Sequence, residues 1–579
     1  MKSMKILALC AAWMVAVPLQ AQEVPPRIQY QFGGSVLNHD MMWATDMAQL
    51  SQTHVFGTAR VMGMGGAFAS LGADLTSMSL NPAGLGMYRR NEVSVTPLVP
   101  VAHASNEGLP SWVGNNKSRF AIANIGAALN VYESSSSSLT SLTIGIGMNR
   151  IADFNTRSSF SSESRFDPST GNYMPTIADI FSQQLNTQGL VPDDFANDWP
   201  NPNVWPAVLG YDGFMVGYYG DDPSNPNPNN PWGVERIGAN ASVLHSMDVV
   251  NSGSINEFDL SVGGNINNIV YFGATLGIQS VYKKTTVTYQ EEYGYNGGIG
   301  LDPSGESLPE QLLLSNLYQR MVLNGSGVNF KLGVVVRPVA GLRLGVAFHT
   351  PTFYSLDRSY QADLFADIQN NAGDDPPVRK GNKTPRAYSE GDNSWDFTSP
   401  ARLMFGASYT FGNFAIVSLD YERDWYNGIR VKNMPEGAAF TEYGYTFSRE
   451  ALKDEFKTRF QGTNSIRAGV ELKPLPILAL RLGGGYTDSM LKDRDYYVMN
   501  AYAGMPMTYE SYYFSAGVGV NLSRSTALDF SYQNVTDKQT DYQLFFSRNM
   551  VTGDLETYSG LYNTSYTRHY IAMTLSFRF

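Results

Sequence analysis

The chain is poor in cysteine and histidine, and these shortages exclude several kinds of active centre. It has 579 residues with one cysteine and six histidines. Cys10 lies in the N-terminal apolar segment, so the rest of the chain can form no disulfide framework, thiolate metal site or catalytic thiol. The histidines have no metal-ligand spacing, and nothing marks a serine–histidine pair or another nucleophile. The sequence therefore predicts no metal, no cofactor, no catalytic residue and no enzyme activity.

Charge and long apolar runs are also scarce. Charged residues make up 16% of the chain, and the net charge of −11 argues against nucleic acid as a partner. No later stretch approaches the ~18 uninterrupted apolar residues of a transmembrane helix. The chain has instead 34 Tyr, 30 Phe, 55 Gly and a mean hydropathy of −0.22. A polar average with many aromatics is typical of membrane barrels, in which lumen-facing and lipid-facing residues alternate.

The first residues indicate export. Residues 1–5 are basic, residues 6–17 are apolar, and a short region ending in Ala21 follows. This layout predicts a secretory signal peptide over residues 1–21, with cleavage after Ala21.

The last strand, Tyr570 to Phe579, is the plainest sign of the fold. Its odd-numbered residues from Ile571 onward are apolar, and the residues between them are small or polar. A period of two predicts a strand with one apolar and one polar face. The same alternation recurs in pairs of segments: near 328–336 and 342–348, 402–411 and 415–421, 466–472 and 478–486, 514–522 and 528–532.

Two features favour a barrel over a soluble sandwich. First, the polar faces carry charges that a wet lumen accommodates: Lys331, Arg337, Arg343, Arg402, Asp420, Glu422, Arg467, Glu471, Arg481 and Asp529. Second, short turns alternate strictly with long connections, as periplasmic turns and external loops do. The short turns are 337–341, 411–413, 473–477 and 523–525; the long connections are 350–398, 426–462, 488–511 and 536–565.

The first half of the chain extends the pattern with five further strands. They are expected near 91–103, 118–132, 140–154, 255–266 and 268–285. The total is about fourteen, an even number as single-chain bacterial barrels require. The predicted fold is an all-β, antiparallel transmembrane barrel over residues 91–579, in the outer membrane of a Gram-negative bacterium. Two segments expected in its external loops, 176–189 and 307–322, have helical spacing of apolar residues.

Residues 22–90 precede the first confident strand and are rich in glycine. A segment of this size cannot build a core of its own, but it can pack inside a barrel, where close approach needs residues without bulk. We therefore predict a plug. Its motif residues are Gly63, Gly65, Gly66, Asp74, Asn81, Pro82, Ala83 and Gly84. A dinucleotide-binding loop at Gly63-x-Gly65-Gly66 is excluded, because no strand precedes it.

This motif resembles the N-terminal hatch signature of the FadL/TodX-type outer-membrane transporters of hydrophobic compounds. Blocks such as Leu342-Arg-Leu-Gly and Leu480-Arg-Leu-Gly are similar in style. The resemblance implies a fourteen-stranded barrel plugged by its N-terminus, passive uptake of hydrophobic molecules, and lateral exit near a kinked strand. The connections near 155–254 and 350–398 are longer than family norms, so the ligand can differ. The carboxylate-binding residues of fatty acid members cannot be placed here.

Three lumenal arginines, Arg343, Arg467 and Arg481, admit two interpretations. They could steer a ligand carboxylate. Alternatively, they form a structural network with Glu471, Asp420 and Asp529, because charges in a lumen pair with one another. The network is the favoured interpretation.

The leading functional hypothesis is a passive, monomeric outer-membrane channel for long-chain fatty acids or other hydrophobic compounds. Its partners would be a hydrophobic small molecule or lipid and the lipid of the outer membrane. The alternative is a barrel of a protein secretion system, similar to the shuttle component of the type IX system, that binds protein partners through its external loops. The long external connections motivate this alternative.

Overall fold

The computed structural model describes most of the chain. The described residues are 30–33, 42–164, 176–195, 204–221, 230–237, 242–294, 308, 310–370, 378–381, 394–435, 440–442, 445–493, 508–539, 546–549, 555–557 and 563–579. The predicted signal peptide, residues 1–21, lies outside them.

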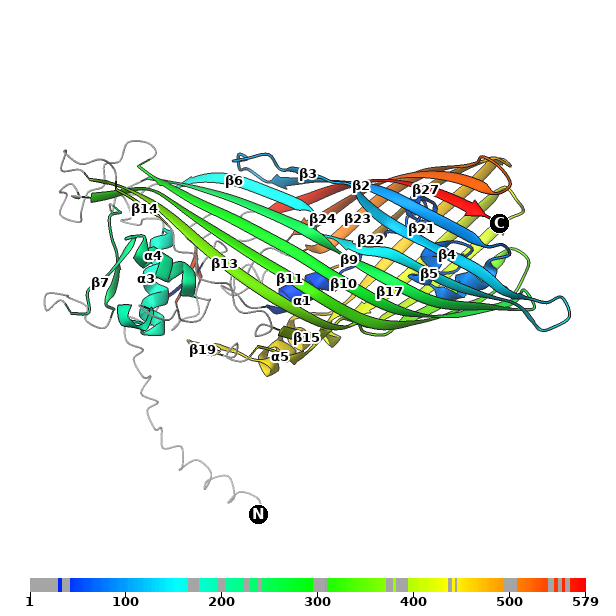
Figure 1. The fold of residues 1–579 in the computed structure, drawn as a ribbon, viewed down its shortest axis with the longest axis horizontal. Coiled ribbons are helices and arrows are strands. Elements are labelled where there is room, and N and C mark those ends of the chain that lie inside the picture. Colours follow the sequence, from blue (N-terminus) through cyan, green and yellow to red (C-terminus); the bar gives the residue numbers. More distant parts are fainter. Residues whose placement is uncertain are drawn as a thin grey trace, which may run out of the picture.

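Fourteen antiparallel strands close into one barrel, which confirms the predicted fold (Figure 1). Closure occurs where the first barrel strand pairs with the last, from Glu92↔Arg578 to Asn106↔Thr564. Some strands consist of two segments in line. In chain order they are β2 (Glu92–Asn106), β3 (Asn116–Ser118) with β4 (Ala121–Glu133), β5 (Leu139–Asp153) with β6 (Thr156–Ser164), β9 (Val243–Ile266), β10 (Val270–Tyr293), β11 (Glu310–Val336), β12 (Leu342–His349) with β13 (Phe353–Asn370), β15 (Ser394–Thr398) with β16 (Arg402–Phe411), β17 (Ala415–Trp425) with β18 (Arg430–Asn433), β21 (Gly462–Leu475), β22 (Leu478–Thr487), β23 (Thr508–Asn521), β24 (Thr526–Gln539) and β27 (Thr564–Arg578).

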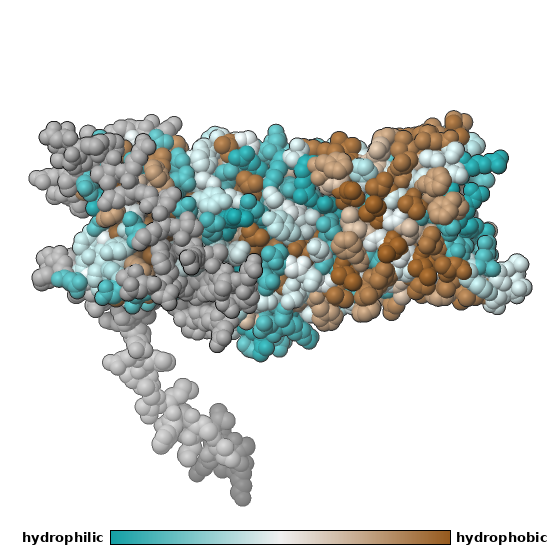
Figure 2. All heavy atoms as spheres, viewed as in Figure 1, coloured by the Kyte–Doolittle hydropathy of each residue, from teal (hydrophilic) through white to brown (hydrophobic). Residues whose placement is uncertain are grey.

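The outer face of the barrel carries an apolar belt. On β9, Phe258 and Leu260 are 52% and 51% exposed, whereas Asp259 between them is 1% exposed because it faces the lumen. On β27 the apolar residues Ile571 to Phe577 are exposed in the same alternation. Figure 2 shows hydrophobic residues gathered over the half of the barrel that holds the C-terminus. A closed barrel with this belt crosses the outer membrane by its strands.

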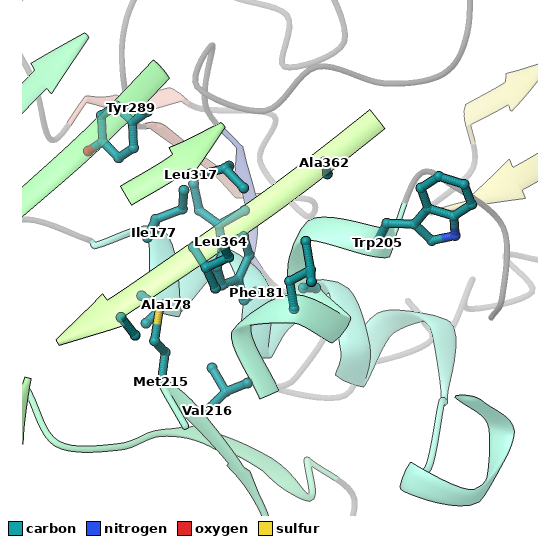
Figure 3. Packing of buried hydrophobic residues seen from close by; sticks show 14 of the residues in the cluster. Ile177, Ala178, Phe181, Trp205, Met215, Val216, Tyr289, Leu317, Ala362 and Leu364 are labelled. Atoms are coloured by element: carbon teal, nitrogen blue, oxygen red, sulfur yellow. The ribbon is translucent and has the colours of Figure 1, made fainter. Parts of the chain in front are cut away.

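The barrel rises well beyond the belt on its extracellular side. There, β9, β10, β11 and β13 form a tall sheet whose lumen-side face packs against α3 (Ile177–Gln188) and α4 (Trp205–Asp212). Figure 3 shows Phe181 of α3 and Leu364 of β13 in this core. The Ile177 amide at the start of α3 donates to Glu291 Oε1 of β10 at 2.9 Å. A folded cap therefore covers this side of the barrel mouth.

The helix predicted for 176–189 is confirmed as α3, Ile177–Gln188, and the helix predicted for 307–322 is wrong. The second segment is the outer part of β11, which pairs with β10 on one side and β13 on the other. Its apolar residues occur at helical spacing, but alternate residues from Ser315 to Leu323 are buried. Hydrogen bonding of the backbone to two neighbouring strands stabilises the strand more than the helical spacing of apolar residues favours a helix. Likewise, the predicted loop 350–398 begins with the long strand β13.

Shorter elements lie around the barrel. They are β1 (Tyr30–Gly33), β7 (Val216–Tyr218), β8 (Trp232–Val234), β14 (Val378–Gly381), β19 (Phe440–Glu442), β20 (Tyr445–Phe447), β25 (Phe546–Asn549), β26 (Leu555–Thr557), α5 (Arg449–Arg459) and the 3-10 turns η4 (Pro192–Phe195) and η6 (Tyr426–Gly428). No described helix is long and apolar enough to span a bilayer.

Residues 42–91, called here the lumenal segment, lie inside the barrel. They contain α1 (Ala44–Leu50), α2 (Ala59–Gly63) and the 3-10 turns η2 (Leu75–Met78) and η3 (Pro82–Met87). The contacts go around the wall: α2 touches β22, β23, β24 and β27; η2 touches β4, β5 and β9; η3 touches β5, β9, β10 and β11. Nearly all of its apolar side chains are buried.

Candidate lumenal binding site

The glycines of the lumenal segment lie against glycines of the barrel wall. A Cβ on Gly65 would be 2.5 Å from Gly484 N, and a Cβ on Gly63 would be 3.1 Å from Gly517 Cα. Gly65 also has a φ of +64°, which favours glycine. The Tyr513 hydroxyl donates to Gly65 O at 2.8 Å. Backbone-to-backbone contact of this kind leaves no space for a side chain on either partner.

The remaining motif residues shape the turns of the same segment. Asn81 caps η3, because its Oδ1 accepts from Ala83 N at 3.1 Å while its Nδ2 donates to Ala69 O at 2.6 Å. Asp74 accepts from the Thr58 hydroxyl at 2.8 Å and from Thr76 N at 3.0 Å. The other members are buried in the same layer: Gly66, Pro82, Ala83 and Gly84. None of the motif residues lines a cavity described below, so they build the segment rather than a ligand site.

The predicted arginines divide between two ion-pair groups. Arg481 Nε lies 2.7 Å from Glu471 Oε2 and its Nη1 lies 2.6 Å from Asp529 Oδ1. Arg60 of α2 joins them through Glu471 at 3.1 Å. Arg467 pairs with Glu422 at 2.8 Å. These contacts join neighbouring wall strands, and the Arg60–Glu471 pair also ties the lumenal segment to the wall.

Arg343 is not brought into either group. Its guanidinium has no ion pair or hydrogen bond within the described part of the chain, and its side chain is half-exposed. Asp420, expected in the network, accepts instead from the Ala69 amide at 2.7 Å. Ligand binding by the three arginines stays a prediction.

One cavity, called here the outer cavity, has a volume of about 150 Å³ and lies above the lumenal segment. One wall is α1, and the others are the lumen-side faces of strands just beyond the apolar belt. Its lining combines apolar side chains with three cations and two carboxylates: Met42, Trp43, Leu50, Phe154, Met247, Val249, Met321 and Leu323, with Lys283, Arg358 and Arg568, and with Asp46 and Asp153. The combination suits an amphipathic compound with an apolar body and an anionic or oxygen-bearing end.

The cations of this cavity are unequally paired. Arg568 pairs with Asp537, and Arg358 lies 3.6 Å from Asp46. Lys283, by contrast, has no carboxylate within ion-pair distance among the described residues; its ammonium lies 5.6 Å from the centre of the Phe154 ring. A partly buried ammonium without a carboxylate is costly unless a ligand or water serves as its partner.

Two smaller cavities, each of about 70 Å³, lie deeper in the lumen. We call them the acidic inner cavity and the mixed inner cavity. The first is lined by Glu422, Asp424, Asp488, Glu510 and Asp537 with Arg467. The second is lined by Glu257, Glu422, Lys331, Arg402 and Arg467. Residues 51–56 of the lumenal segment line both and separate them from the outer cavity.

The barrel wall has a break beside the outer cavity. The ladder between β4 and β5 ends at the Asn124↔Asn149 pair, although both strands continue. Beyond it, Arg150 Nε donates to Ile122 O at 3.2 Å, and Arg150 Nη1 lies 3.0 Å from Asp153. Arg119 reaches the same carboxylate at 3.1 Å. Side chains thus close a gap that backbone pairing leaves open.

Sequence reasoning missed Lys283, Arg568, Arg150 and His54. Lys283 lies on the inner face of a strand whose expected end was residue 285, but the sequence does not show which inward cation lacks a partner. Arg150 was within an expected strand, with no sign that the ladder ends there. These features depend on neighbours that are distant in sequence.

No family model and no curated protein matches the chain. Among solved structures, it is similar to a Pseudomonas aeruginosa FadL homologue at 12% identity and a TM-score of 0.47, with 91% of this chain and 99% of that chain covered. It is also similar to the Pseudomonas putida toluene transporter TodX, at 12% identity and a TM-score of 0.45 over 91% of this chain and 100% of that one. A third similar structure is the monoaromatic hydrocarbon channel CymD, at 13% identity and a TM-score of 0.43, with 90% of this chain and 97% of that chain covered. At these identities and TM-scores the likeness carries no argument about the ligand.

Proposed function

We propose that this barrel is a passive channel that takes up hydrophobic compounds across the outer membrane, with the lumenal segment as its plug. The observation that supports the proposal is the outer cavity, which combines many apolar side chains with the ammonium of Lys283, for which no described carboxylate lies within ion-pair distance. Together with the ligand hypothesis drawn from the sequence, this cavity makes long-chain fatty acids and other hydrophobic compounds the ligand classes to test.

The size of the outer cavity favours a small ligand. Its volume of about 150 Å³ equals that of an engineered protein cavity that holds benzene. A ring-sized body therefore fits, and a carboxylate on it would lie near Lys283. A long-chain fatty acid would place only its head and first carbons in this space.

The test is uptake of radiolabelled benzoate and palmitate by cells that lack other channels of this kind. Expression of the barrel should raise the initial uptake rate of at least one compound above that of cells with an empty vector. If folded barrel is present in the membrane and neither compound is taken up faster than by empty-vector cells, the proposed function is contradicted.

Replacement of Lys283 by methionine tests the role of the ammonium. Methionine keeps most of the length and apolar volume but removes the charge. We expect binding of benzoate to purified barrel to weaken about tenfold, because a charged hydrogen bond contributes roughly 1.5–3 kcal/mol. Binding of toluene, measured in the same calorimetric assay, should stay within twofold of wild type. Equal losses for both ligands would show that Lys283 only supports the fold.

The gap beside Arg150 is the proposed exit to the membrane. Since Cys10 is the only cysteine and lies in the predicted signal peptide, an Ile122→Cys/Arg150→Cys pair can be cross-linked with a bis-methanethiosulfonate reagent, which forms a disulfide to each cysteine with release of sulfinate. We expect cross-linking to abolish benzoate uptake and reduction to restore it. The matched control is Asn124→Cys/Asn149→Cys, across the intact ladder, where cross-linking should leave uptake unchanged. Full uptake after complete cross-linking at the gap would exclude this exit.

The extracellular cap supports the second candidate function, binding of a protein partner. Its helices share a core with residues of β6, β9, β10, β11 and β13, so the described part of the connection between β6 and β9 offers a folded surface. Purification from native membranes separates the two candidates. A stoichiometric protein bound through the cap would favour the partner-binding role, and bound lipid or aromatic compound would favour the channel.

A further inference from the structure

Residues 51–56 cross the lumen between the three cavities, and one side chain borders all of them. Gln52 lines the outer and acidic inner cavities, whereas Thr53 and Val55 line the two inner ones. His54 lines the outer cavity and both inner cavities, and no other described residue does so. Its imidazole therefore stands where the three spaces meet.

The backbone of this crossing is fixed at several points. Arg402 Nη2 donates to Ser51 O at 3.0 Å, and the Gln52 side chain donates to Thr508 O at 3.0 Å. The His54 amide donates to Ile151 O at 2.9 Å. Phe56 is buried edge-on against Tyr570, with ring centres 4.9 Å apart. The main chain is thus held on both sides of His54.

The imidazole itself is held weakly. Its Nε2 lies 3.4 Å from Arg568 Nη1, and its buried Nδ1 has no hydrogen-bond partner among the described residues. Burial, together with the Arg568 charge, lowers the pKa of His54 to about 3, so the ring is neutral at physiological pH. Because the ring makes only one long hydrogen bond and leaves a buried nitrogen unsatisfied, rotation of the side chain away from this position loses little interaction energy.

We propose that the His54 side chain is the gate at the junction of the three cavities and sets the size of compound that leaves the outer cavity. The inference rests on the proposed uptake function. The His54 amide binds Ile151, which lies in β5 at the gap beside Arg150, so the same residue borders the proposed exit. The ring therefore borders both the route from the outer cavity to the gap and the route to the inner cavities.

The test compares a one-ring with a two-ring carboxylate, benzoate and 1-naphthoate, in the uptake assay. Wild type should take up benzoate faster than naphthoate. His54→Ala and His54→Ser remove the ring, and we expect both to raise the ratio of naphthoate to benzoate uptake about threefold or more, since pocket shape sets such ratios. His54→Trp should lower this ratio below that of wild type. His103→Ala, on the exposed part of β2, is the histidine control and should not change the ratio.

The outcomes separate the two proposals. If wild type takes up neither compound faster than empty-vector cells, the uptake function is wrong. If wild type takes up both but the ratio is unchanged in all three His54 variants, or both rates fall equally, His54 is structural and the gate is wrong. Heat-dependent mobility on a gel measures the folded fraction, by which each rate is normalised.

Discussion

Replacement of Gly483 by leucine should prevent the lumenal segment from docking in an otherwise closed barrel. A Cβ on Gly483 would overlap the backbone of Met64 and Gly65, and backbone atoms cannot move aside as a side-chain end can. Overpacking of a tight interior costs about 1–3 kcal/mol or more. Here the same layer repeats around the wall, because Gly273 faces Pro82 and Gly345 faces Ala69. Loss of one contact should therefore loosen the whole segment.

The measurement is single-channel conductance in a planar bilayer together with trypsin cleavage at Arg60. Wild type should show little steady conductance and slow cleavage, and Gly483→Leu should show a large open conductance and fast cleavage. The control is Gly114→Leu, because nothing lies within 4 Å of a Cβ at Gly114. A closed, protease-resistant Gly483→Leu barrel would show that the segment is not held by this packing.

Replacement of Glu471 by glutamine should have the second large effect, on stability. Glu471 is fully buried and is shared by Arg60, Arg481 and Lys473 at 3.1, 2.7 and 3.2 Å. Without its charge, the buried guanidiniums of Arg60 and Arg481 lose a common partner. Removal of one member of a buried ion pair typically costs about 3–5 kcal/mol. Urea unfolding in lipid vesicles should show a loss of this order.

A double replacement separates the charge effect from packing. Arg60→Gln with Glu471→Gln removes one charge of each sign, so it should be less destabilising than the sum of the two single changes. Asp529→Asn is the milder comparison, because the Asp529 side chain is 12% exposed and Arg481 keeps Glu471. Additive losses in the double variant would mean that Arg60 and Glu471 do not interact across the interface.

The alternation of apolar and polar residues predicted the strands of the barrel. In a strand between lipid and lumen, successive side chains point alternately to the lipid and to the lumen, so apolar and polar residues alternate. This rule worked for the end of β27, where the odd-numbered residues from Ile571 to Phe577 are all exposed. It failed for the outer part of β11, which lies beyond the lipid. There one face of the strand packs under the extracellular cap and the other face is outside the lipid. Apolar and polar residues therefore no longer alternate clearly along this part of the strand.

The sequence by itself determined the barrel, its strand number, the polar lumen and the glycine-rich segment. All of these depend on local periodicity or composition, which neighbouring residues display directly. The tertiary structure decided which lumenal charges pair, where the ladder between β4 and β5 ends, and where cavities remain. Lys283 and Arg481 are both inward cations on strands, but Arg481 lies opposite Glu471 of the adjacent strand β21, whereas Lys283 has no carboxylate within ion-pair distance among the described residues. Such differences depend on the register of strands and on residues far apart in the chain, so they cannot be predicted from local sequence patterns.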